Sequence, residues 1–242
     1  MTFPKAPLSL RAKRSNLGGA VNERVSREPL MSEQPTLAQH RERLEELRRR
    51  LGAEHPETLA AMLDLAEMLW ARGHLTEVRA LEEHVVAVRR RDHGEAHGDT
   101  LKALGKLATT IGAEGDLAEA RRLQEHILAL APEVWGEDAR DTLRALNNLA
   151  GTVAAQGDLP GARAMLETAI EELHRQFGDN DSDTAAAIGN LAAILWQHGE
   201  RGEAYWLQAQ LVETQRRLRG EDDPLTRAAL AVLAAMQHDG MP

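Results

Sequence analysis

Residues 141–182 read DTLRALNNLAGTVAAQGDLPGARAMLETAIEELHRQFGDNDS, and this stretch decides the fold. Apolar residues in its first half recur at spacings of three and four, which predicts an amphipathic helix. Gly157 ends that helix, because glycine adopts the left-handed backbone common at helix C-termini. A second apolar stripe of the same spacing follows and ends before Gly178, so the stretch predicts a pair of helices.

The same pattern recurs along the chain with a period of 42 residues. Three series mark the period: Gly52, Gly94, Gly136, Gly178 and Gly220; Thr58, Thr100, Thr142, Thr184 and Thr226; and Leu65, Leu107, Leu149, Leu191 and Leu233, each leucine followed by alanine. Periods of 20 to 50 residues indicate stacked supersecondary units. A helix pair leaves one apolar face uncovered, and the next pair covers it.

The period predicts an all-α fold, a right-handed α-α superhelical solenoid of four helix pairs with a capping helix at each end. The predicted pairs are 57–98, 99–140, 141–182 and 183–224, and the capping helices lie in 35–56 and 225–242. The preceding residues 1–34 are basic and lack periodicity, which predicts disorder. Met31 is an alternative start, which leaves open whether residues 1–30 belong to the functional protein.

Composition excludes several classes of function. The chain of 242 residues has a formal net charge of −9 although its first 34 residues are basic. A body so acidic disfavours binding to nucleic acid or to anionic membranes. The chain has no cysteine, one tyrosine and, after residue 34, only Ser182 as a serine, so it offers few nucleophiles. We therefore expect a cytoplasmic protein that is not an enzyme and needs no cofactor.

The repeated residues resemble those of the tetratricopeptide repeat (TPR) family. The resemblance rests on Asn148-Leu149-Ala150, Val153, Gly157, Leu159 and Ala162, and on Asn190-Leu191-Ala192, Leu195, Gly199 and Ala204. The period and the strings GEDARDTLRALNNLA and LGAEHPETLAAMLDLA are similar to the kinesin-light-chain subtype, and the high Ala and Arg content suggests a bacterial source. The chain departs from the pattern where Glu82, Gln124 and Gln208 place polar residues in second helices.

The resemblance implies that the first helix of each pair lines a concave groove that binds extended peptides. Carried over to this chain, it predicts a groove formed by Lys102, Lys106, Arg144, Asn147, Asn148, Asn190, Trp70 and Trp196. Lys and Arg pair with ligand carboxylates, and asparagine bonds a peptide backbone. The alternative is that the polar residues are ordinary solvated positions and that Trp70 and Trp196 only pack. Trp135 and Trp206 are interpreted as structural.

Three functional hypotheses follow. The first is a non-catalytic scaffold that binds an extended, acidic segment of a partner protein. The second is a regulatory sensor whose superhelix responds to a peptide or small ligand, and the third is an enzyme or enzyme subunit. Self-association through the C-terminal helix is a further possibility, with Leu230, Leu233 and Met236 as contact residues.

Two clusters imitate metal sites without completing one. His93 and His97 are four residues apart, but the adjacent glycines place them in a loop between units. Asp179, Asp181 and Asp183 have the spacing of a calcium loop, yet Thr184 replaces its glycine and Asn190 its glutamate. We therefore predict no metal site.

Overall fold

The computed structural model describes residues 36–137, 139–178 and 181–238, so the basic segment 1–34 lies outside the described residues. Within those ranges the chain forms ten helices and no strand. The helices are α1 (Leu37–Leu51), α2 (Pro56–Trp70), α3 (Leu75–His93), α4 (Gly98–Glu114), α5 (Leu117–Trp135), α6 (Arg140–Ala155), α7 (Leu159–Phe177), α8 (Ser182–His198), α9 (Arg201–Arg219) and α10 (Pro224–His238).

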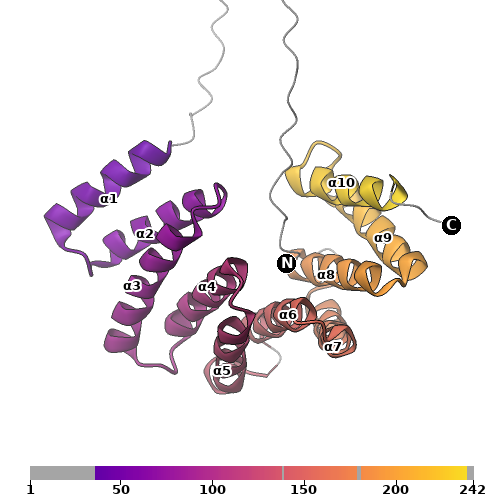
Figure 1. Ribbon diagram of the computed structural model, residues 1–242, viewed down its shortest axis with the longest axis horizontal. Helices are drawn as coiled ribbons and strands as arrows, with labels where there is room; N and C mark the ends of the chain where they lie inside the picture. The colour runs from indigo at the N-terminus through magenta and orange to yellow at the C-terminus, as the bar shows by residue number, and fades with distance from the viewer. Residues whose placement is uncertain (1–35, 138, 179–180, 239–242) are drawn as a thin grey trace, which may run out of the picture.

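Each helix packs mainly against the helix before it and the helix after it. Figure 1 shows the result as an open arc, with α4, α6 and α8 on its inner side and α5, α7 and α9 on its outer side. Contacts between α4 and α6 and between α6 and α8 join successive pairs. The predicted all-α superhelical solenoid, with α1 and α10 at its ends, is confirmed.

At two of the turns between helix pairs, a recurring threonine is hydrogen-bonded to a recurring glycine. Gly94 follows α3 with φ of +88°, a conformation that favours glycine. Its carbonyl oxygen accepts a hydrogen bond of 2.8 Å from the hydroxyl of Thr100, which is fully buried in α4. Gly136 and Thr142 repeat this contact at 2.7 Å one period later. Thr58, Thr184 and Thr226 are buried as well, but their hydroxyls have no hydrogen-bond partner among the described residues, so this bond is made at two of the turns between pairs.

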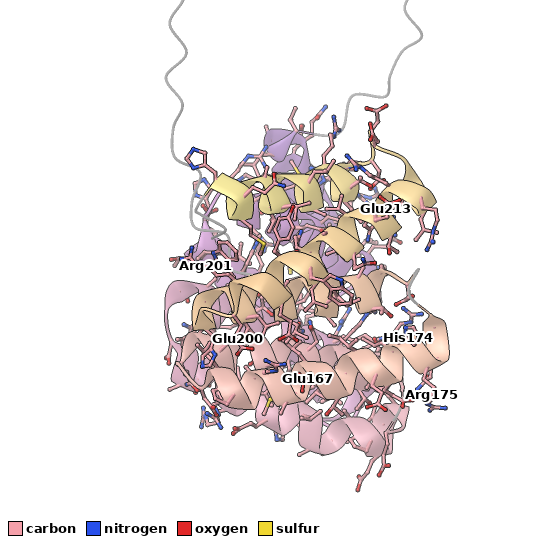
Figure 2. All side chains as sticks on the ribbon, turned by 90° about the vertical axis from the view of Figure 1, so that its right-hand side faces the viewer. Glu167, His174, Arg175, Glu200, Arg201 and Glu213 are labelled. Atoms are coloured by element: carbon pink, nitrogen blue, oxygen red, sulfur yellow. The ribbon has the colours of Figure 1, made fainter. Side chains whose placement is uncertain are left out.

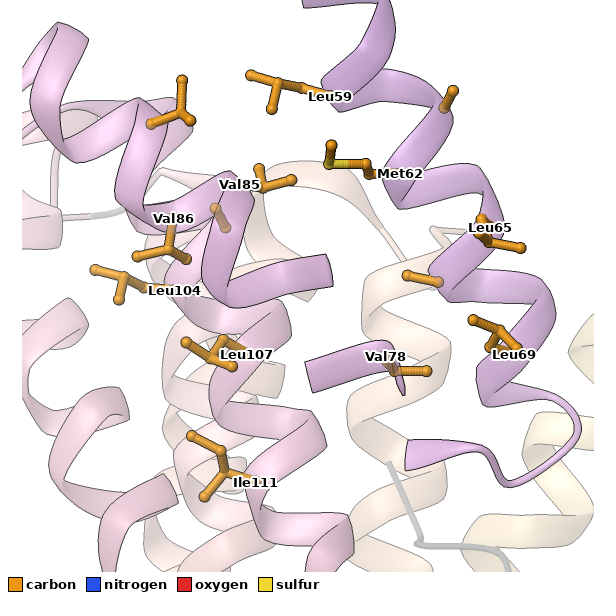
Figure 3. Close-up of a cluster of buried hydrophobic side chains, with 14 of the residues drawn as sticks. Leu59, Met62, Leu65, Leu69, Val78, Val85, Val86, Leu104, Leu107 and Ile111 are labelled. Carbon is orange, nitrogen blue, oxygen red and sulfur yellow. The ribbon is translucent and has the colours of Figure 1, made fainter. Parts of the chain in front are cut away.

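The core consists of aliphatic side chains between neighbouring helices and falls into two clusters, one from α1 to α5 and one from α6 to α9. Figure 3 shows its N-terminal part, where Met62 and Leu69 of α2 lie near Val78 and Val85 of α3. All four side chains are nearly or fully buried. Burying such a side chain contributes about 1.5 to 3 kcal/mol relative to leaving it exposed. The core is therefore distributed along the arc.

The outer surface carries ion pairs that link adjacent units. Arg163 of α7 pairs with Glu167 of its own helix and with Glu200 of the next unit, each at 2.7 Å, and Figure 2 shows both glutamates on this outer side. Trp206 of α9 is 59% exposed, so interpreting it as a structural residue was wrong. It occupies a solvent-facing position of a second helix, where the equivalent residue one unit earlier is Ala164, also exposed.

The exposed apolar residues of α10 are different from those predicted. Met236 is buried, and Leu230 and Leu233 are half-buried because α10 packs these residues toward α9. Leu225 and Val232 are the large apolar side chains that α10 exposes. Self-association through this helix stays a prediction. Among the described residues, none of the helices is both long enough and apolar enough to span a membrane.

Candidate functional site

A cavity of about 530 Å³ opens between the first three helix pairs. Its lining comes from five successive helices, α2 to α6. Five of the eight predicted groove residues line it: Trp70, Lys102, Lys106, Arg144 and Asn148. Three others, Asn147, Asn190 and Trp196, do not. The repeat geometry brings α2, α4 and α6 side by side, and this stacking makes a common surface from residues that are distant in the sequence.

The cationic side chains at the cavity differ in their partners. Lys102 lies 2.8 Å from Asp141, and Arg144 lies 2.8 Å from Asp183. Each of these carboxylates belongs to the first helix of the following unit. Lys106 has no carboxylate within ion-pair distance among the described residues. The predicted basic strip is therefore largely paired within the protein, and Lys106 is its unpaired member.

A carboxylate lies in the floor of the cavity. Glu82 of α3 is only 6% exposed, and its Oε2 accepts a 2.6 Å hydrogen bond from the buried hydroxyl of Thr110 in α4. Burial raises the pKa of Glu82 above its ordinary value, and the hydrogen bond from Thr110 and the charge of Lys106 offset only part of that shift. The floor therefore contains an incompletely compensated acidic group.

Gln124 of α5 occupies the equivalent position one period later and also lines the cavity. It is 4% exposed, and its Oε1 is buried without a hydrogen-bond partner in the described part of the chain. A buried polar atom without a partner costs roughly 1 to 3 kcal/mol. The sequence marked Glu82 and Gln124 as departures from the family pattern. Only the structure shows that both residues line a cavity.

Asn147 and Asn190 were expected in the groove, but they are bonded to each other and do not line the cavity. Both side chains are buried, and Asn190 Nδ2 donates a 3.0 Å hydrogen bond to Asn147 Oδ1. The bond joins α6 to α8, because the stacking of successive first helices turns these two amides toward each other. They are consequently structural partners, whereas Asn148, which is half-buried, faces the cavity.

The tryptophans that line the cavity are Trp70 and Trp135, and Trp196 is not among them. Trp70 lines the cavity, while Trp196 lies outside it with the guanidinium of Arg201 at 4.9 Å from its ring centre. Trp135 was interpreted as structural, but it forms part of the cavity wall. Gly98 permits this position, since a Cβ there would lie 2.8 Å from the indole Nε1 of Trp135.

Comparison with known proteins identifies the repeat. TPR sequence profiles match residues 58–99, and also residues 99–171 and 141–205 in two overlapping segments. Together these matches cover more than half of the chain. The chain belongs to the tetratricopeptide repeat family. A search of curated proteins finds no significant match to this TPR protein.

Solved structures place this TPR protein beside kinesin-light-chain-like repeats. A protein of Podosopora anserina described as a kinesin light chain with nearly identical TPR-like repeats is 25% identical, with a TM-score of 0.59 over 75% of this chain and 85% of the other. BtubC (BKLC) from P. vanneervenii is 19% identical, with a TM-score of 0.65 over 84% of this chain and 82% of the other.

A third similar structure is a Rap protein complexed with competence and sporulation factor. It is 13% identical, with a TM-score of 0.62 over 83% of this chain and 59% of the Rap chain. At this identity the likeness concerns the fold. The family and its structural neighbours together support a protein–protein interaction scaffold.

Proposed function

We propose that this TPR protein is a non-catalytic, cytoplasmic interaction module that binds an extended, acidic segment of a partner protein at the cavity of α2 to α6. The observation that carries the proposal is the position of Lys106 at this cavity without an ion pair to any residue that the structure describes. A charge-assisted hydrogen bond to a carboxylate is about twice as strong as a neutral one. Asn148 at the same cavity supplies an amide donor and acceptor for a peptide backbone.

The paired cations support the same proposal in a secondary role. Lys102 and Arg144 keep about half of their side-chain surface exposed while they contact Asp141 and Asp183. Their carboxylate partners are less exposed, with 25% of the Asp141 side chain and 15% of the Asp183 side chain accessible. An incoming carboxylate can therefore share the exposed part of these two cations, whereas at Lys106 it competes with no ion pair among the described residues.

Gly105 offers a direct test, because it lines the cavity and a Cβ there would meet no atom within 4 Å. Gly105→Met places a long side chain in part of the cavity while it improves helix propensity. Gly105→Ala makes the same backbone change and leaves most of the cavity open. Immobilised wild type and both variants would be used to capture proteins from a lysate of the source organism. We expect partners that are retained by wild type and Gly105→Ala and lost with Gly105→Met.

Reversing the charge of Lys106 is the second test in the same capture experiment. Lys106→Glu should lose the same partners because it places a carboxylate where the ligand carboxylate binds. Arg122→Glu is the matched control, since Arg122 lies on the second helix α5 with an exposed side chain. Circular dichroism verifies that all variants keep wild-type helicity. Partners retained equally by every variant would contradict binding at this cavity.

A regulatory sensor is the second candidate function. The cavity is lined by residues of three consecutive helix pairs, so a ligand within it touches all three at once. Such a ligand would alter the angle between pairs, and the change would accumulate along the arc. Small-angle scattering of the protein with and without a captured peptide tests this function. An unchanged radius of gyration with the peptide bound would oppose it.

A further inference from the structure

The floor of the cavity offers hydrogen-bond acceptors that lack donors. Among the described residues, Glu82 receives one hydrogen bond, from the neutral hydroxyl of Thr110. Gln124 Oε1 receives none in the part of the chain that the structure describes. Both side chains are more than nine-tenths buried and line the same cavity. A ligand group that enters this space must therefore donate hydrogen bonds to compensate the buried oxygens.

The charges around the cavity favour a cationic donor. Lys102, Asp141 and Arg144 belong to one ion-pair network that also includes Asp183. Outside that network, the charged residues of the lining are Glu67, Glu82 and Lys106, and the balance among these three is one negative charge. The chain as a whole is acidic as well, with a formal net charge of −9. A positive group therefore gains attraction both locally and from the protein field.

The walls fit the rest of a long basic side chain. Trp70 and Trp135 line the cavity together with Leu63, Val78 and Ile127. Methylene groups pack on such surfaces while the charged head group reaches a polar partner. The ammonium of Lys102 already lies 5.9 Å from the ring centre of Trp135, which shows that this ring accepts a cation nearby.

We propose that the cavity takes a basic side chain, arginine or lysine, of the bound segment, with its head group at Glu82. The inference rests on the proposed function, because a ligand carboxylate that pairs with Lys106 neutralises the positive charge that otherwise stabilises the Glu82 carboxylate. A basic residue near that carboxylate then supplies the missing charge. The recognised segment accordingly combines an acidic residue for Lys106 with a basic residue for the floor.

Arginine fits the site better than lysine. Its planar guanidinium has five N–H donors, stacks on aromatic rings and carries a weaker hydration shell than an ammonium group. A floor with two acceptors, Glu82 and Gln124, uses several of those donors. Lysine places a compact, strongly hydrated charge on a flexible stem, so we expect it to bind more weakly.

Selection from a library of random 12-residue peptides displayed on phage tests the inference with the full chain. Wild type, Glu82→Gln and Glu83→Gln serve as immobilised targets. Glu83→Gln is the matched control, because Glu83 is the next residue of α3 and its exposed carboxylate contacts Arg79 instead of the cavity. We expect wild type and Glu83→Gln to enrich peptides with a basic residue at one fixed position, and Glu82→Gln to lose that preference.

Titrations of the enriched peptide locate its basic residue. Replacing its arginine by citrulline keeps the shape and removes the charge, and it should weaken binding to wild type at least tenfold. The same replacement should change binding to Glu82→Gln less than threefold. In ¹⁵N spectra the indole signals of Trp70 and Trp135 should shift on binding, whereas that of the exposed Trp206 should stay.

The outcomes separate the inference from the function on which it rests. Enriched peptides that need Lys106 but lack a basic residue would overturn the basic anchor and leave the proposed function standing. Equal effects of citrulline on wild type and Glu82→Gln would also overturn it. A failure to enrich any peptide on wild type would count against both.

Discussion

Removing the hydroxyl of Thr110 should destabilise the protein through Glu82. Thr110→Val keeps the size and β-branching of the side chain and deletes the donor of the 2.6 Å bond. The carboxylate of Glu82, which is 6% exposed, then has no hydrogen-bond partner among the described residues. The perturbation thus isolates one buried polar interaction at the floor of the candidate site.

The expected loss follows from the burial of both groups. A hydrogen bond to a charged group contributes about 1.5 to 3 kcal/mol. We expect Thr110→Val to lower the free energy of unfolding by about 2 kcal/mol at pH 8. For a domain of this size that loss lowers Tm by about 4 to 8 °C.

The loss should depend on pH in a defined direction. Burial raises the folded-state pKa of Glu82, so its contribution to stability is complete at low pH and declines as pH rises through that pKa. Thr110→Val raises the pKa further, because it removes an interaction that favours the carboxylate. The variant should therefore be less destabilised at pH 5, where Glu82 is closer to neutral, than at pH 8.

A second substitution should rescue the first. Two periods later, Leu166 and Ile194 occupy the positions of Glu82 and Thr110, and both are buried. The double variant Glu82→Leu/Thr110→Val imitates that apolar pair. Replacing buried charged groups by apolar residues of similar volume is often neutral or stabilising by about 1 to 4 kcal/mol. We expect the double variant to be at least as stable as wild type.

Guanidinium unfolding followed by circular dichroism at pH 5 and pH 8 measures wild type, Thr110→Val, Glu82→Leu and the double variant, which together form a double-mutant cycle. The reasoning is refuted if Thr110→Val changes the unfolding free energy by less than about 0.5 kcal/mol at pH 8, a change typical of surface positions. It is also refuted if the double variant is less stable than Thr110→Val alone.

Three further predictions concern the framework of the site and use the same unfolding assay. Asn190→Ala strands the buried amide of Asn147 and should cost about 1 to 3 kcal/mol. Asn148→Ala should cost less, because the Asn148 side chain makes no hydrogen bond to the residues that the structure describes. Leu166→Ala should cost about 2 to 5 kcal/mol, because Leu166 is fully buried in the core. Burial alone would raise the pKa of Asp181, but Arg140 and two backbone amides lower it overall, so its stabilisation is present above the ordinary Asp pKa and lost as pH falls below it. Asp181→Asn should consequently flatten the acid limb of the stability profile, and an unchanged limb would contradict this.

The repeat made the helical architecture predictable from the sequence. A stripe of apolar residues specifies one face of a helix, and the glycines at fixed spacing specify where each helix ends. Gly94 and Thr100, for example, mark a turn whose bond depends only on residues six apart. Because each unit contacts mainly its neighbours, the same local rules applied to every unit give the whole solenoid.

The candidate site was only partly predictable. Position on a helix placed Lys102, Lys106 and Arg144 on the inner face, and all three line the cavity. The partners of these residues come from the next unit: Asp141 for Lys102, and Asp183 for Arg144. Helical periodicity gives the face on which a side chain lies, but it does not give the distance to a side chain about 40 residues later.

Sequence alone therefore determined the units, their ends and their apolar faces, since those depend on contacts within a turn or two of the chain. Only the tertiary structure decided that Asn147 bonds Asn190, that Trp135 borders a cavity and that Glu82 is buried in its floor. The physical reason is that the rotation and offset between stacked pairs set which polar side chains meet. Those quantities arise from packing between units and not from the pattern within one.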